Sequence, residues 1–318
     1  MANQKNVLGL FDFSKKAAVA PPRWIPATAS SCLITDWNKS SALKSSQPIY
    51  DAFIGEPGAW SRLLEDFKFD PDMQLDIQKF VAALDDRTIL MSHLTKDGSG
   101  KNDQPVLGIK IKRDSRFVMD SIKRAVGSDS KIQIVGFEGI EATWNSNVED
   151  VDTKVFQLPD EKDENEIGEN ETKPEKRFFV TANGFLLVSN NKEQIRLLLK
   201  KGEKGTLVEA DDYIQLHAAL GKLTDSRKIG IRSFGRMDLC LKPSYELIRR
   251  GEFEWLPWLD RREELEDGKP KPKRVARFDG SSLPKNFEKV VAPYLGLFGW
   301  VLENELDGWV ITGCILKK

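Results

Sequence analysis

Apolar and polar residues along the chain recur with two different periods, one of which predicts strands and the other helices. Alternation with a period of two is typical of a half-buried strand, whereas apolar residues spaced three and four apart are typical of an amphipathic helix. Residues 178–202 show both patterns. Two short apolar runs flank Asn183 and Gly184, the strongest local signal of a β-hairpin, because both residues tolerate positive φ. A helix is predicted next, with Ile195, Leu198 and Leu199 on one face.

The ends of this predicted helix carry capping signals. Asn190 is expected to accept hydrogen bonds from the first turn, and Glu193 stands three residues later, as in a capping box. Gly202 follows Lys200 and Lys201 and is expected to end the helix. Because every local rule agrees, we interpret 178–202 as a packing unit rather than a strained active site.

The same patterns predict the other elements and the fold class. Strands are expected at 31–37, 87–94, 106–113, 131–144, 228–234, 275–280 and 297–316. The segment 131–144 is expected to be two strands bent at Gly136 or Gly139, and 297–316 a hairpin that turns at Asp307-Gly308. Helices are expected at 58–69, 75–84, 115–127, 211–223 and 244–251, and from 286 to an end near Pro293. In the helix at 211–223, Ile214, Ala218 and Leu220 are expected to face packing partners. Strands in hairpins with helices between them favour an α+β fold with mostly antiparallel sheets.

The polar stretches indicate how the chain is organised. Residues 1–20 are expected to be a mobile tail, and 21–318 an α+β domain or two halves, 21–205 and 206–318. Residues 158–177 have almost no apolar content, so we predict a disordered insertion there, and residues 266–274 are predicted to be an exposed loop. Residues 108–127 and 184–202 share the order glycine, strand, polar cap, helix, glycine. This likeness reflects either a duplicated β-α unit or the ordinary appearance of any such unit.

Charge and hydropathy exclude several classes of protein. The 318 residues include 48 basic and 49 acidic side chains, and this balance argues against a general nucleic-acid-binding protein. No apolar run is long enough to cross a bilayer. The first 22 residues lack the apolar core of a secretory signal, so no export signal is expected in this chain.

The chain has few candidates for catalytic or metal-binding residues. Cys32, Cys240 and Cys314 are too far apart for a disulfide framework or a zinc site, so we expect buried small side chains, with a reactive thiol as the alternative. The segment 97–102 lacks the full pattern of a phosphate-binding loop. The two histidines, His93 and His217, are expected to be structural. We therefore predict no catalytic residue, no cofactor and no metal site.

The tryptophans are the main candidates for binding. Eight of them are scattered along the chain, as expected for core packing. Trp255 and Trp258 flank Pro257 among charged residues, and they are the best candidates for an exposed aromatic patch. Such a patch would bind a protein partner or an apolar ligand.

The order of segments resembles an uncharacterised bacterial family, whose members are described only as membrane or secreted proteins or as a domain of unknown function. The matching stretches include PPRWIPATASSCLITDWN, FDPDMQLDIQKFVAALDDRTILM, VLGIKIKRDSRFVMDSIKRAVG, FEGIEATW, FFVTANGFLLVSNNKEQIRLLLKKG, SYELIRRG and DGWVITGCILKK. The resemblance covers nearly all of the chain from residue 21. It implies export or attachment to the cell envelope, and it supplies no functional residues.

Three functions are compatible with these observations. The first is a non-catalytic module of the cell envelope that binds a protein or forms part of an assembly, and the lack of an acid–base constellation favours it. The second is a carrier that holds an apolar ligand between the sheet and its helices, with tryptophans lining the cavity. The third is a hydrolase that uses Cys240 or Ser281 with a histidine.

Overall fold

The computed structural model describes most of the predicted elements. The described residues are 12–13, 20–70, 74–93, 105–112, 115–127, 134–138, 154–155, 177–189, 191–199, 205–225, 229–250, 265–266, 269–270, 280, 282–305 and 308–317. Most of the predicted tail at 1–20 and of the insertion at 158–177 lies outside these ranges, as do Trp255 and Trp258. Within the loop predicted at 266–274, the structure describes Glu266, Lys269 and Pro270, which belong to a short hairpin of β9 (Leu265–Glu266) and β10 (Lys269–Pro270).

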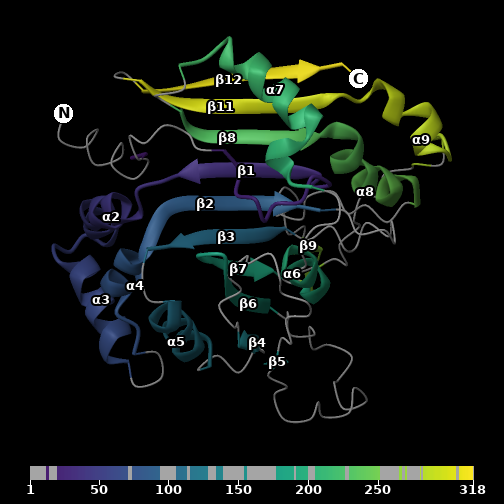
Figure 1. The fold of residues 1–318 in the computed structure, drawn as a ribbon. Coiled ribbons are helices and arrows are strands. Elements are labelled where there is room, and N and C mark those ends of the chain that lie inside the picture. Colours follow the sequence, from purple (N-terminus) through teal and green to yellow (C-terminus); the bar gives the residue numbers. More distant parts are fainter. Residues whose placement is uncertain are drawn as a thin grey trace, which may run out of the picture.

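One large sheet organises the molecule (Figure 1), and its strand order is β12-β11-β8-β1-β2-β3-β7-β6-β4-β5. All neighbouring strands pair antiparallel except β4 and β6, which pair parallel. The predicted α+β class with mostly antiparallel pairing is therefore confirmed. The strands are β1 (Ser31–Asp36), β2 (Leu84–Ser92), β3 (Val106–Ile111), β4 (Ile134–Glu138), β5 (Lys154–Val155), β6 (Arg177–Ala182), β7 (Phe185–Ser189), β8 (Ile229–Arg236), β11 (Leu297–Glu305) and β12 (Gly308–Leu316).

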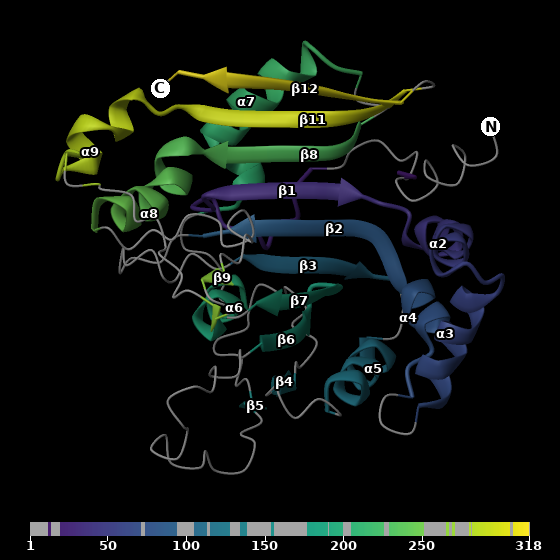
Figure 2. The ribbon, with the colours of Figure 1, turned by 180° about the vertical axis from the view of Figure 1, so that it is seen from behind.

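The helices lie at the two ends of the sheet and on its faces (Figures 1 and 2). Three helices connect β1 to β2 at one end, and α8 and α9 lie at the other end. The helices are α2 (Lys39–Ile54), α3 (Ala59–Phe69), α4 (Ile77–Ala83), α5 (Ser115–Gly127), α6 (Lys192–Leu199), α7 (Asp211–Gly221), α8 (Met237–Arg250) and α9 (Phe287–Val290), with short 3₁₀ turns at Leu207–Glu209 and Ala292–Tyr294.

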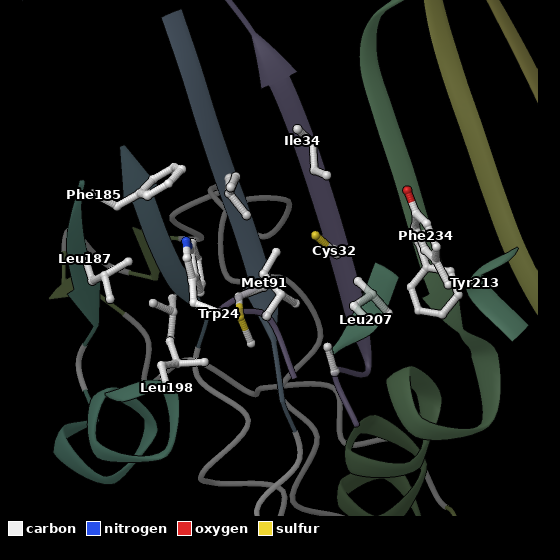
Figure 3. Close-up of a cluster of buried hydrophobic side chains, with 14 of the residues drawn as sticks. Trp24, Cys32, Ile34, Met91, Phe185, Leu187, Leu198, Leu207, Tyr213 and Phe234 are labelled. Atoms are coloured by element: carbon white, nitrogen blue, oxygen red, sulfur yellow. The ribbon is translucent and has the colours of Figure 1, made fainter. Parts of the chain in front are cut away.

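The main core covers one face of the sheet, which we call the covered face (Figure 3). Its strand side chains include Cys32 and Ile34 of β1, Met91 of β2, Leu187 of β7 and Phe234 of β8. Helices α6 and α7, the 3₁₀ turn at Leu207–Glu209 and the segment before β1 pack on them through Trp24, Ile25, Ile195, Leu198, Leu207, Tyr213, Leu216 and Leu220. Burial of these apolar side chains is the main favourable contribution to folding.

The described part of 178–202, which is the β6–β7 hairpin and α6, packs in the main core as the sequence predicts, whereas Gly202 lies outside the described residues. Asn183 and Gly184 have φ of 54° and 72°, as a two-residue hairpin turn requires. Ile195 and Leu198 of α6 are buried. The predicted cap is wrong by one residue, because Asn191 Oδ1 accepts the hydrogen bond from the amide of Gln194, at 3.4 Å.

The stripe predicted on α7 is partly wrong. Leu220 is buried as expected, but Ile214 is 49% exposed and Ala218 is also exposed. Tyr213 and Leu216 are the buried residues instead. Leu216 packs closely on the sheet because Gly299 of β11 leaves room for it, and a β-carbon on Gly299 would lie 2.7 Å from Leu216 Cδ2.

The two β-α segments that resemble each other in sequence lie side by side, because β3 and β7 pair antiparallel. Their helices cover opposite faces of the sheet. Helix α6 packs on the covered face, whereas Val118 and Ile122 of α5 pack on the other face with Leu84 and Leu186. A two-fold axis between antiparallel neighbours preserves the face of the sheet, so these segments are not a symmetric pair.

Candidate functional site

The second face of the sheet is covered only in part. Helices α4 and α5 pack on it over β3, β6 and β7. Over β12, β11 and β8, α7 packs on the strands from the covered face. Figure 2 shows the second face toward the viewer, and no described helix lies in front of the middle of β12, β11, β8 and β1.

We call this region the open face, and its strand pairing places apolar side chains in rows. Leu302 of β11 stands between Ile231 of β8 and Ile311 of β12, and Phe298 stands opposite Ile315. The apolar side chains of the open face are Leu33, Leu90, Ile231, Phe298, Trp300, Leu302, Trp309, Ile311 and Ile315.

The open face is most exposed along its outermost strand, β12. Ile311 and Ile315 are 67% and 69% exposed, and Trp309 is 39% exposed. Val310, which points to the covered face, is also 47% exposed because no described strand lies beyond β12. A contiguous exposed apolar surface of this kind marks an interaction site more often than isolated exposed side chains do.

The strand β12 also lacks the features that protect the edge of a sheet. An edge strand presents unpaired backbone groups, and proteins that stay monomeric shield such edges with charged residues, proline, bulges or very short strands. The nine residues of β12, GWVITGCIL, include no charged residue and no proline. At the other end of the strand order, β5 has only two residues, and one of them is Lys154.

Each of the two histidines has a structural contact. His93 Nε2 lies 2.8 Å from Thr28 Oγ1, and the side-chain amide of Gln194 donates to the backbone oxygen of His93. His217 on α7 hydrogen-bonds to Arg232 of β8. Burial lowers the pKa of His217, and the nearby Arg232 charge lowers it further. The neutral imidazole is therefore the form that the fold favours.

The cysteines are free thiols with different degrees of burial. Burial raises the pKa of Cys32 to about 12, so this side chain behaves as the small apolar residue that was predicted. Cys314 on β12 is half-buried, and burial raises the pKa of its thiol as well. Cys240 on α8 is also half-buried, and its thiol donates to the backbone oxygen of Ser30 at 3.3 Å. Ser281 lies outside the described residues.

Lys39 has an unusual environment for a lysine. Burial lowers the pKa of Lys39 to about 8, although the charges of Asp86 and Asp85 raise it. Its ammonium group donates to the backbone oxygens of Asp85 and Asp86 at 2.7 and 2.8 Å. These bonds connect the start of α2 to the start of β2, so the side chain has a structural role that accounts for its burial.

The described residues provide neither a metal-binding cluster nor a helix suited to the membrane. Across the described ranges, His, Cys, Asp and Glu side chains do not gather in groups of three or more that would hold a metal ion. The same residues include no helix with the length and apolar character that crossing a bilayer requires.

The predicted binding residues, Trp255 and Trp258, lie outside the described part of the chain. An exposed aromatic residue that the structure does describe is Trp309, which was expected from the sequence to pack in the core. The sequence signal for this surface is the uncharged run GWVITGCIL, in which apolar residues point to both faces of the sheet. Comparison of the chain with known protein families, curated proteins and solved structures finds no match.

Proposed function

We propose that the protein is a non-catalytic binding module that joins an assembly through β12, by pairing this strand with a strand of a protein partner. The observation that carries the proposal is the edge itself, nine residues long and free of charge and proline. Addition of a strand to an open edge is a common mode of protein recognition, in which backbone hydrogen bonds provide affinity and alternate side chains provide specificity.

The side chains next to the edge favour the same mode of binding. A strand added beside β12 would cover parts of Ile311 and Ile315 on the open face and of Val310 on the covered face. Removing an isoleucine that is about two-thirds exposed from water contributes roughly 1–2 kcal/mol. Several such side chains provide the apolar centre that a stable interface needs.

The location of the assembly is the second part of the proposal. We place it in the bacterial cell envelope, and the resemblance of segments such as FFVTANGFLLVSNNKEQIRLLLKKG to exported proteins supports this assignment. Fractionation of native cells tests it, with the protein expected in the envelope fraction. Recovery only with cytosolic markers would contradict the location and leave the binding proposal standing.

Purification of the protein from native cells with its bound partners tests the binding proposal. Ile311→Lys and Ile315→Lys place charge on β12, and we expect both variants to lose the proteins that the wild type retains. Ile214→Lys is the matched control, because Ile214 is 49% exposed on α7 and lies away from the edge. Equal recovery of partners by all three variants would show that binding does not involve β12.

A further inference from the structure

We propose that the strand that pairs with β12 is β12 of a second copy of this chain, in an antiparallel pair centred on Thr312. The inference rests on the proposed function and names its partner. Closed two-fold dimers are the most common assemblies of identical chains, and their interface uses the same surface on both subunits. Self-pairing of β12 therefore requires this strand to complement itself.

The geometry of a sheet limits the ways in which β12 can pair with itself. Residues directly opposite each other in an antiparallel pair point to the same face, and side chains alternate between faces along each strand. A two-fold axis through such a pair therefore passes through a residue that faces its own copy. Thr312 is the middle residue of β12 (Gly308–Leu316), so a pair centred there uses all nine residues.

This register produces compatible neighbours at every position. Thr312 faces its own copy, and threonine pairs are favourable across strands. On the open face, Trp309 stands opposite Ile315, an aromatic residue beside a β-branched one, which is another favourable combination. On the covered face, Val310 stands opposite Cys314. The remaining pairs are Ile311 with Gly313 and Gly308 with Leu316, so that a large residue faces a small one.

Charge is compatible with the same arrangement. Because β12 has no charged residue, self-pairing brings no like charges into direct opposition. Lys317 is exposed just after β12, and the antiparallel register places it at the end of the second copy's β11–β12 hairpin. Glu305 of β11 lies at that end, opposite Gly308. The described charges at each end of the paired strands are therefore of opposite sign, and self-pairing opposes no like charges there.

The dimer would extend one sheet through both copies. Since the axis is perpendicular to the sheet, both copies of α7 lie on one side and both open faces lie on the other. The exposed side chains Trp309, Ile311 and Ile315 then stand in the middle of a doubled apolar surface instead of at its margin.

Sedimentation equilibrium of the full chain, supported by charge variants of Thr312, tests the proposal. We expect the wild type to have the mass of two chains, and Thr312→Lys and Thr312→Asp to have the mass of one, because each variant opposes like charges at the axis. An equimolar mixture of the two variants is expected to recover the mass of two chains, since lysine then faces aspartate. This recovery also shows that both variants are folded.

Cysteine cross-linking tests the register. In a chain with Cys240→Ser and Cys314→Ser, Thr312→Cys is expected to form a disulfide-linked dimer under mild oxidation, because the two Cα atoms are within the 4.4–6.8 Å that a disulfide spans. Ile311→Cys is the control, because position 311 faces position 313, and it is expected to cross-link at least tenfold more slowly.

The outcomes separate this inference from the proposed function. A single-chain mass for the wild type at every concentration, or a dimer that persists in both charge variants, overturns self-pairing at Thr312. If the single chain still retains a different protein that Ile311→Lys loses, the edge is a binding site for that protein and the proposed function stands. If it retains none, both proposals fail.

Discussion

The ring of Phe298 on β11 lies directly over Gly235, its cross-strand neighbour on β8. A β-carbon built on Gly235 would stand 2.1 Å from Phe298 Cε1 and 2.3 Å from Cζ, which is inside the contact distance of carbon atoms. The bare backbone at residue 235 therefore allows the aromatic ring to approach β8 this closely. This contact fixes the position of Phe298 beside the exposed residues of β12.

Gly235→Ala is expected to destabilise the fold by about 1–3 kcal/mol, because the added methyl group displaces the Phe298 ring from a well-packed position. Urea unfolding measures the loss. Gly221→Ala is the control, since a β-carbon there meets no atom within 4 Å and the residue ends a helix. This variant should be neutral or up to about 1 kcal/mol more stable. Equal effects at the two positions would contradict the packing argument.

Leu198→Ala is expected to cost about 2–5 kcal/mol, the usual range for a leucine removed from a core. Leu198 on α6 is 2% exposed and belongs to the main core cluster. Ile214→Ala removes a side chain of similar size from the exposed side of α7 and should change stability by less than about 0.5 kcal/mol. A loss well under 1 kcal/mol for Leu198→Ala would show that α6 does not pack as described.

The sequence predicts an element well where local signals and burial agree. The β6–β7 hairpin and α6 are examples, because Asn183-Gly184 and the apolar spacing of α6 each indicate the observed structure. Residues 38–54 were not predicted to be a helix, and here the signals conflict. Helix α2 contains Pro48 and many polar residues, and its cap is the side chain of Asn38, which accepts from the amide of Ser41. Similarly, α8 begins at Met237 and contains Pro243, whereas the sequence predicts this helix only from residue 244.

The candidate site was harder to predict, because it depends on which strands are neighbours. An apolar run such as GWVITGCIL has the same pattern in a strand buried on both faces and in an edge strand. The run FLLVS of β7 illustrates the first case, since it lies between β3 and β6 and is mostly buried. Only the strand order shows that β12 has a neighbour on one side alone among the described residues.

Stability is expected to depend on the ionisation of His217. Burial and Arg232 hold its pKa below the ordinary 6.5, so the unfolded chain binds the proton more readily than the folded chain does. The stabilising contribution of the neutral imidazole is complete above pH 6.5 and is lost as the pH falls below that value. Urea unfolding of the wild type and of His217→Gln between pH 5 and 8 measures it. The wild type should lose more stability than the variant on acidification, and parallel profiles would contradict this assignment.

The ion pair of Asp36 and Arg87 is buried on the covered face, and its removal tests how much this pair contributes to stability. The two residues are opposite each other on β1 and β2, and their side chains form two hydrogen bonds, of 2.8 and 2.9 Å. Each side chain is only 11% exposed, so removal of one partner leaves the other charge in the interior without its hydrogen-bonded partner. Asp36→Asn and Arg87→Met should therefore each cost about 3–5 kcal/mol.

Replacing both charges together gives the opposite expectation. In the double variant Asp36→Leu with Arg87→Met, no charge is left unpaired and two apolar side chains fill the space, so its stability should be close to that of the wild type or higher. Glu288→Gln is the control, because it removes the exposed pair with Lys242 and should change stability by less than about 1 kcal/mol. Urea is the suitable denaturant, since an ionic one would screen these charges. A double variant as unstable as the sum of the single changes would show that Asp36 and Arg87 stabilise the sheet independently of each other.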